Sequence, residues 1–433
     1  MANIKKLFVK HLVIFVCVLA GLTAMLVLAA KLPKSKIQDN MIESAEFLCE
    51  DKVFTYAVEG VNSTQLDRYA DSILLAIAYQ YDSDASLESI IWSSYYNNPL
   101  KNENDNLYVA VTEGVEANKQ YLRYWHGSNV IVRTLHLVFN LEQIYIFNEI
   151  IMALLVVILV AMLVKKKAYV PAIGVFVSLI ATAVWLVPMS LEYTWTYLIM
   201  LVMAIVGVKL SYRKKLDNIS VLFMVGGMVT NYLDFLSTET LTLTVPLLLI
   251  LWIKDKEEKT DKKDSIRFVA KNMVAWGIGY VGMWISKWII SAIVLGENVM
   301  PYVSEHIGER LGGDVGLNIF QYIFGAVARN IRCLFPLDYG AGGLFVGMGI
   351  GLFVLYVGYV HYGKKEDKSM IPMYVFIAFI PYIRFIVLHN HAYLHYFFTY
   401  RAQMATVLAT IFILDLLTDR RWLACGRSKR KRA

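Results

Sequence analysis

Long uninterrupted apolar runs are the feature that most constrains this chain. The runs from Ile150 to Val164 and from Leu344 to Val360 contain no charged residue and lack the apolar/polar alternation of membrane barrel strands. Because no water reaches the hydrocarbon core of a membrane, backbone groups there must be paired inside a helix or a closed barrel. We therefore expect membrane-spanning helices.

The composition supports a membrane protein with many spans. Hydrophobic residues make up 57% of the chain and charged residues only 18%, which is more apolar surface than one soluble core can bury. We expect an all-α polytopic membrane protein with about ten transmembrane helices, since about 20 apolar residues cross the hydrocarbon core. The expected spans are His11–Ala30, Ile144–Val164, Tyr169–Pro188, Tyr193–Leu210, Ile219–Leu236, Leu241–Ile253, Phe268–Leu295, Gly340–Val360, Ile371–Leu388 and Ala402–Leu417.

The positive charges lie at the ends of these runs. The net charge is +7, but no nucleic-acid motif accompanies the basic clusters, so we expect no nucleic-acid partner. Placing both termini in the cytoplasm puts every cluster on the cytoplasmic side, as the positive-inside rule requires of a multi-pass protein of the cell membrane. The clusters are Lys165–Lys167, Arg213–Lys215, Lys254–Lys263, Lys364–Lys365 and Arg427–Arg432.

This topology divides the chain into four parts. Residues 1–31 form a transmembrane anchor, which we favour over a cleaved signal peptide because the run is long. Residues 32–142 are polar and form a mostly helical extracytoplasmic domain between the first and second spans. Residues 143–418 form the helical bundle, with an outer amphipathic segment near 312–337. Residues 419–433 form a basic cytoplasmic tail.

Two cysteines, Cys49 and Cys333, are expected on the outer side. A disulfide between them and two unpaired small side chains are both compatible with their positions.

The first candidate for chemistry is an acidic pair in the outer segment. Asp67 and Asp71 are four residues apart within Leu66–Tyr79, so a helix would place both carboxylates on one face. Such a pair can hold one carboxyl protonated and leave the other as a base. The alternative is a solvated helix start with Asp67 near the cap. We rank Asp71 first as the catalytic base and expect it to be exposed, so that Asp71→Asn abolishes turnover with little loss of stability.

The second candidate cluster comprises Arg123, Trp125 and His126, shortly before the second span. Arginine binds phosphate oxygens, aromatic rings stack on sugars, and imidazole carries protons. An interfacial aromatic belt with arginines reaching the headgroups is the competing interpretation.

The third cluster comprises His389, His391, His395 and Arg401. The spacing of His391 and His395 matches a metal-ligand pair, but no carboxylate motif accompanies it, so we assign no metal ligand. Phosphate contact or proton transfer is the favoured role, and a divalent metal is the one cofactor left open.

Asp234 and Lys287 are ionisable residues within or beside spans. Such residues usually face the protein interior or a water-filled cavity. They are candidate substrate-binding residues, and an ion pair between them that holds helices together is the alternative.

The arrangement resembles the GT-C superfamily of membrane glycosyltransferases across nearly the whole chain. The local stretches with this resemblance are Tyr124–Gly127, Gly226–Ser237 and His389–Arg401. The resemblance implies an outward-facing site, a polyprenyl-phosphate-linked sugar as donor, and a glycan or other cell-envelope acceptor. An acidic pair directly after the first span is absent, which leaves Asp39, Glu43 and Glu46 as further candidates for the base.

The implied mechanism is a single displacement, in which a carboxylate deprotonates the acceptor while Arg or His stabilises the departing phosphate. Two alternatives stay open. One is a transporter or flippase for a lipid-linked or anionic substrate, although ionisable residues concentrate on one side. The other is a membrane acyltransferase or polysaccharide polymerase.

Overall fold

The computed structural model describes residues 2–258, 261–311, 316–361 and 369–417. The structure is 77% helical with almost no sheet. Up to residue 135 the chain contains α1 (Ala2–Ala30), α2 (Gln38–Cys49), β1 (Phe54–Tyr56), β2 (Gln65–Asp67), α3 (Arg68–Gln80), α4 (Ser86–Trp92), α5 (Glu103–Thr112) and α6 (Asn129–Leu135). The remainder contains α7 (Leu141–Lys165), α8 (Tyr169–Ala181), α9 (Leu191–Tyr212), α10 (Ile219–Leu233), α11 (Leu241–Glu258), α12 (Lys262–Leu295), α13 (Met300–Leu311), α14 (Ile319–Cys333), α15 (Gly340–His361), α16 (Ile371–Val387), α17 (His389–Leu394), α18 (Tyr396–Thr399) and α19 (Met404–Leu417).

Six helical segments are long and apolar enough to cross a membrane: Phe8–Ala30, Leu141–Lys165, Leu191–Tyr212, Lys262–Leu295, Gly340–Val357 and Tyr396–Leu417. Each of the ten expected runs contains an α-helix, but α8 and α16 are shorter apolar helices, and α10 has 15 residues. The class of helical membrane protein is therefore supported, and the number of ten crossings stays a prediction. The expected tail 419–433 and the clusters Lys364–Lys365 and Arg427–Arg432 lie outside the described residues.

Helix α11 occupies the centre of the bundle. Every residue from Leu241 to Ile253 is buried, which explains why a run this short is so apolar. Beside it, α10 and α12 approach closely, because a Cβ on Gly227 or Gly279 would collide with the backbone of the other helix. Small residues permit such contacts between membrane helices.

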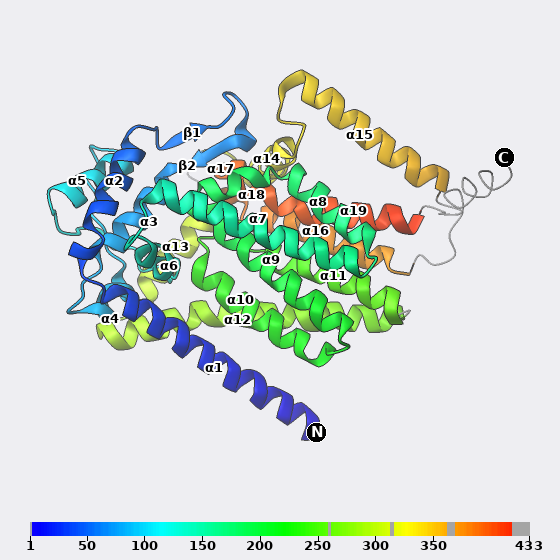
Figure 1. Cartoon of the computed structure of the whole chain (residues 1–433), viewed down its shortest axis with the longest axis horizontal. Helices are drawn as coiled ribbons and strands as arrows, with labels where there is room; N and C mark the ends of the chain where they lie inside the picture. The colour runs from blue at the N-terminus through cyan, green and yellow to red at the C-terminus, as the bar shows by residue number, and fades with distance from the viewer. Residues whose placement is uncertain (1, 259–260, 312–315, 362–368, 418–433) are drawn as a thin grey trace.

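The polar outer segment does not have a separate hydrophobic core. Its apolar residues form one cluster with Trp195, Met228 and Met283 of the long helices. In Figure 1, α2 to α6 cover one end of the bundle, and α1 contacts α6 while α7 contacts α2 there. An independent inserted domain therefore stays a prediction, since the packing is continuous.

The cysteine and amphipathic predictions have clear outcomes. Cys49 and Cys333 are both free, at the ends of α2 and α14, so a disulfide between them is not formed.

The described part of the expected amphipathic segment contains α14, which exposes Phe320 and Phe324 and buries Asn330. Its apolar face points outward, as in a helix that contacts lipid. Helix α15 stands apart from the bundle for most of its length (Figure 1).

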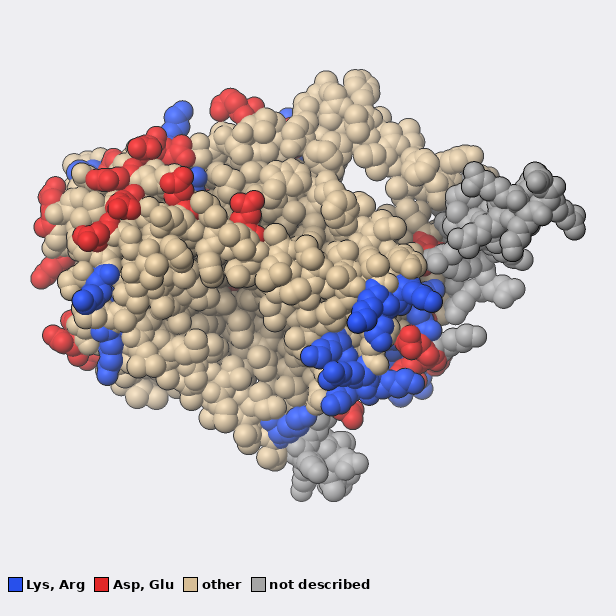
Figure 2. Space-filling view, viewed as in Figure 1, with Lys and Arg blue, Asp and Glu red and all other residues tan. Residues whose placement is uncertain are grey.

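Charges segregate between the two ends of the molecule. Figure 2 shows acidic side chains gathered over α2, α3 and α5, whereas lysines and arginines gather at the opposite end. This distribution agrees with the positive-inside pattern on which the expected topology rests.

Candidate functional site

A cavity of about 290 Å³ lies where the outer segment meets the bundle. Its lining combines carboxyl groups, a guanidinium, imidazoles and aromatic rings. The lining residues are Phe54, Asp67, Tyr69, Ala70, Ile73, Leu74, Tyr121, Arg123, His126, Glu192, Phe235, His391 and His395. The three sequence clusters, far apart along the chain, thus each contribute to one cavity.

Asp67 is placed at this cavity by a short antiparallel hairpin. β1 pairs with β2 so that Phe54 lies opposite Asp67. Asp67 also caps α3, because its Oδ1 accepts a hydrogen bond from the amide of Ala70 at 2.8 Å. The alternative of a solvated helix start is therefore correct about the cap but wrong about the solvent, because Asp67 is buried. Asp67 caps α3 and lines the cavity at the same time. Burial raises the pKa of Asp67 to about 7, and hydrogen bonds from Ala70 and Glu192 oppose the increase.

Glu192 is the partner that the sequence reasoning missed. It lies in the first turn of α9, is 7% exposed, and its side chain is hydrogen-bonded with that of Asp67. Its Oε2 is buried without a hydrogen-bond partner among the described residues. The sequence contains one signal that could have identified Glu192. An acidic residue at the start of an apolar run is costly to bury unless it has a function or a partner.

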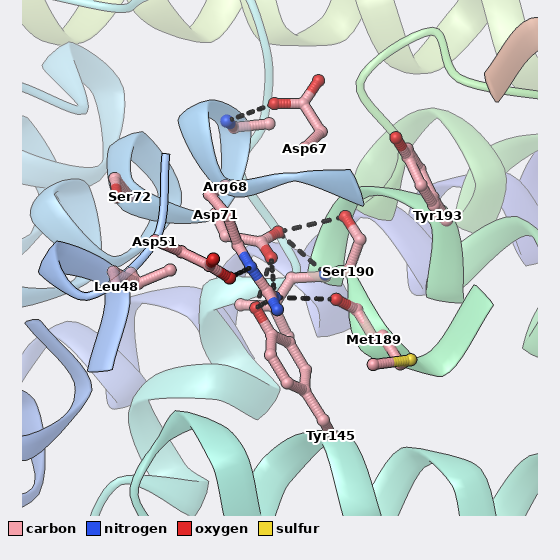
Figure 3. Close-up of polar contacts among 12 residues, drawn as sticks. Leu48, Asp51, Asp67, Arg68, Asp71, Ser72, Tyr145, Met189, Ser190 and Tyr193 are labelled. Atoms are coloured by element: carbon pink, nitrogen blue, oxygen red, sulfur yellow. Dashed lines mark hydrogen bonds and ion pairs between the residues drawn. The ribbon is translucent and has the colours of Figure 1, made fainter. Parts of the chain in front are cut away.

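Asp71 does not line the cavity, contrary to its rank as the first candidate base. Figure 3 shows its polar contacts with residues of the surrounding segments. Its side chain is fully buried and accepts hydrogen bonds from the Tyr145 hydroxyl at 2.5 Å and the Leu191 amide at 2.8 Å. Arg68 Nη1 lies 3.9 Å from its Oδ2. Asp71 therefore joins α3 to α7 and to the N-terminus of α9, where a carboxylate is favoured by the helix dipole. The expectation of an exposed Asp71 was wrong.

The segment from Tyr121 to Gly127 is fixed against the long helices. Trp125 Nε1 donates to the carbonyl of Met283 at 2.9 Å, and the amide of Gly127 donates to the carbonyl of Tyr232 at 2.9 Å. A Cβ on Gly127 would collide with the Tyr232 ring. Trp125 is 1% exposed and does not line the cavity. Its bond to Met283 anchors this segment, and its contact with a substrate stays a prediction.

Arg123 presents a cation to the cavity. Its guanidinium lies 4.9 Å from the ring centre of Tyr121 and 5.0 Å from that of Tyr124. Its Nη2 donates to the Tyr121 hydroxyl at 2.7 Å. Contact with these two rings and the hydrogen bond to the Tyr121 hydroxyl orient the planar guanidinium, which suits it to bind phosphate oxygens.

His126 lines the cavity as a neutral ring. Burial lowers its pKa to about 3, so it is not a general base at neutral pH. Its Nε2 is 2.9 Å from the carbonyl of Tyr121, which assigns the proton to Nε2 and leaves Nδ1 as an acceptor. Nδ1 is buried without a hydrogen-bond partner in the described parts of the chain. It can accept a hydrogen bond from a ligand hydroxyl.

His391 and His395 also line the cavity, with ring centres 4.7 Å apart. Arg384, which the sequence reasoning did not select, lies behind them, with its Nη2 3.4 Å from His391 Nδ1. Arg384 also forms an ion pair with Glu239 at 3.0 Å. These contacts fix His391 in place.

The other two residues of that cluster are structural by geometry. Neither lines the cavity. His389 Nδ1 lies 3.2 Å from the carbonyl of Ile386. Arg401 is 1% exposed, stacks 4.6 Å from the ring centre of Tyr193, and donates to the carbonyl of Ser63. Both were expected to bind substrate, and that role stays a prediction.

Asp234 and Lys287 point inward as expected but do not reach the cavity. Asp234 accepts hydrogen bonds from the amide and hydroxyl of Ser237. Lys287 donates to the carbonyls of Ile90 and Ile91, each at 3.1 Å, which are in the last turn of α4, where a cation is favoured. The ion pair between them is not among the described contacts.

No group of three or more His, Cys, Asp or Glu is arranged to hold a metal ion within the described ranges. The described residues therefore offer no ligand set for a divalent metal, and participation of a metal stays a prediction.

The fold and this cavity define the chain as a helical membrane protein with a polar, aromatic-lined site at the end of the bundle covered by α2 to α6. No protein-family model, curated protein or solved structure matches it.

Proposed function

We propose that this protein is a membrane glycosyltransferase that uses a polyprenyl-phosphate-linked sugar at an outward-facing site. The observation that carries the proposal is one cavity that joins a carboxyl pair, a guanidinium held by aromatic rings and several imidazoles at the acidic end of the molecule. These groups match the needs of sugar transfer from a phosphate: a base, a phosphate contact and acceptors for hydroxyl groups.

Asp67 is the proposed base. A carboxyl group whose pKa is near the working pH is efficient in proton transfer, and burial places Asp67 in that range. Glu192 acts as a positioning residue, since its hydrogen bond orients the Asp67 carboxylate. In the reaction the acceptor hydroxyl loses its proton to Asp67, the new glycosidic bond forms, and the bond between sugar and phosphate breaks.

Arg123 and the pair His391 and His395 are the proposed contacts of the departing phosphate. They line the cavity together with Asp67. One cavity can therefore hold both the leaving phosphate and the acceptor hydroxyl that the base deprotonates. Phe54, Tyr69, Tyr121 and Phe235 offer ring faces for a sugar. The neutral Nδ1 of His126 accepts from a hydroxyl.

The test uses the purified full chain with a labelled pool of polyprenyl-phosphate sugars from the host membrane. We expect sugar to leave the lipid only when a glycan acceptor is present, with product attached to that acceptor. Substrate flux across liposomes without a covalent product would instead favour the transporter alternative.

A further inference from the structure

A second concave site lies at the other end of the molecule, far from the cavity described above. It is a groove of about 490 Å³ between α1, α10 and α12, which is within the size range of small-molecule sites. Its walls are mostly apolar side chains, among them Leu12, Phe15, Met224 and Ile278.

The groove is bounded along its length by contacts between the helices. The ring of Phe15 packs against Gly282, where a Cβ would lie 2.7 Å from it. Nearer the basic end, His11 Nε2 lies 3.2 Å from Ser220 Oγ and joins α1 to α10. An apolar groove on a membrane helix bundle is filled by a lipid chain, since exposure to water is unfavourable there.

The rim carries positive charge. Lys271 lines the groove and is exposed. Lys10, next to the lining residue His11, is exposed and donates to Asn218 Oδ1 at 3.0 Å. We propose that this groove binds the acyl chain of an anionic membrane lipid, whose phosphate lies against Lys10 and Lys271.

A second apolar groove provides an internal comparison. It has a volume of about 280 Å³ between α7, α8 and the following 3₁₀ turn, and its charged lining residue is Glu149. An acidic rim repels an anionic headgroup. The selectivity that we propose therefore depends on the lysines of the first groove and not on apolar surface alone.

The test is native mass spectrometry of the full chain mixed with equimolar phosphatidylglycerol and phosphatidylcholine that have identical acyl chains. We expect phosphatidylglycerol to be retained preferentially, and Lys10→Gln and Lys271→Gln each to reduce that preference about fivefold. Lys166→Gln, an exposed lysine outside the groove, should leave it unchanged.

Filling the groove supplies a second variant. Val274 lines it and is 60% exposed, so Val274→Trp should fold and reduce retention of both lipids at this site. Val157→Trp in the comparison groove, at a position 63% exposed, is the matched control and should leave the retained phosphatidylglycerol unchanged. Equal retention of the two lipids by the unaltered protein, or full retention by Val274→Trp, would overturn the proposal.

Discussion

The buried carboxyl groups of α3 show how position in a helix decides the role of a residue. Asp67 and Asp71 are one turn apart, yet Asp67 lines the cavity at the cap and Asp71 is enclosed by α7 and α9. A base needs contact with the reacting hydroxyl. Asp67 meets this condition and Asp71 does not.

The pKa of Asp67 predicts the acid side of the pH profile. A carboxylate base works only when deprotonated, and burial raises the pKa of Asp67 to about 7. We therefore expect kcat/KM to fall about tenfold per pH unit below about pH 7, and to be constant above it until another group titrates. Steady-state rates over a pH series provide the measurement. A profile flat down to pH 5 would contradict the role of Asp67.

Glu192 should set the pH below which kcat/KM falls. Its hydrogen bond lowers the pKa of Asp67 against the effect of burial, so Glu192→Leu should raise that pKa and move the acid limb to higher pH. Glu192→Gln retains an N–H donor and should leave the limb near its original position. If both variants show the original limb with equal loss of kcat, the role of Glu192 is only steric.

Asp71 should be required for stability. Asp71→Ala removes the acceptor of Tyr145 and Leu191 and leaves Arg68 buried without this carboxylate. Breaking a buried charged network by removing one partner costs about 3–5 kcal/mol. Thermal unfolding in detergent provides the measurement, with Asp84→Ala at an exposed position as the control. A melting temperature equal to that of the control would contradict the structural role.

At the scale of elements, glycine contacts set the spacing of α10 and α12. Gly279→Ala places a methyl group against the backbone carbonyl of Met224, and overpacking of this kind costs about 1–3 kcal/mol. Gly277→Ala, two residues away on the same helix, meets no atom within 4 Å and should be neutral or slightly stabilising. Unfolding in a denaturing detergent compares the two. Equal effects would contradict the close contact.

Sequence reasoning identified elements better than it identified contacts. Apolar runs located the long helices, because a membrane imposes both their length and their composition. The hairpin that brings Phe54 opposite Asp67 has strands of only three residues each, too short for a periodic signal. Glu192 and Arg384 lie on apolar helices. Glu192 joins the site through its contact with Asp67, which lies more than 100 residues earlier in the chain, and Arg384 joins it through His391.

Lys287 and Arg401 are two buried cations whose contacts the sequence did not predict. Lys287 and Arg401 were selected because buried charge near a membrane suggests a binding site. Each instead donates to backbone carbonyls of a neighbouring segment. The sequence does not distinguish these two uses, since both require the same buried cation.

At the scale of the whole molecule, the segregation of charge predicts orientation. In a variant in which the native cysteines are replaced by serine, new cysteines at the exposed positions Lys101 and Asn298 should react with an impermeant reagent on intact cells. Cysteines at the exposed positions Lys166 and Lys214 should not. The reverse labelling pattern would place the cavity on the cytoplasmic side and contradict an outward-facing site.

The most direct test of the proposed function is the turnover of Asp67→Asn with labelled polyprenyl-phosphate sugars and a glycan acceptor. Asparagine can still cap α3, so the protein should fold, as judged by unaltered thermal unfolding. Loss of a general base typically reduces the rate about 10²- to 10⁴-fold. Asp84→Asn, at an exposed position of the same outer segment, should retain full turnover. The account predicts a loss of this size in Asp67→Asn alone, and near-full transfer by a folded Asp67→Asn protein would contradict it.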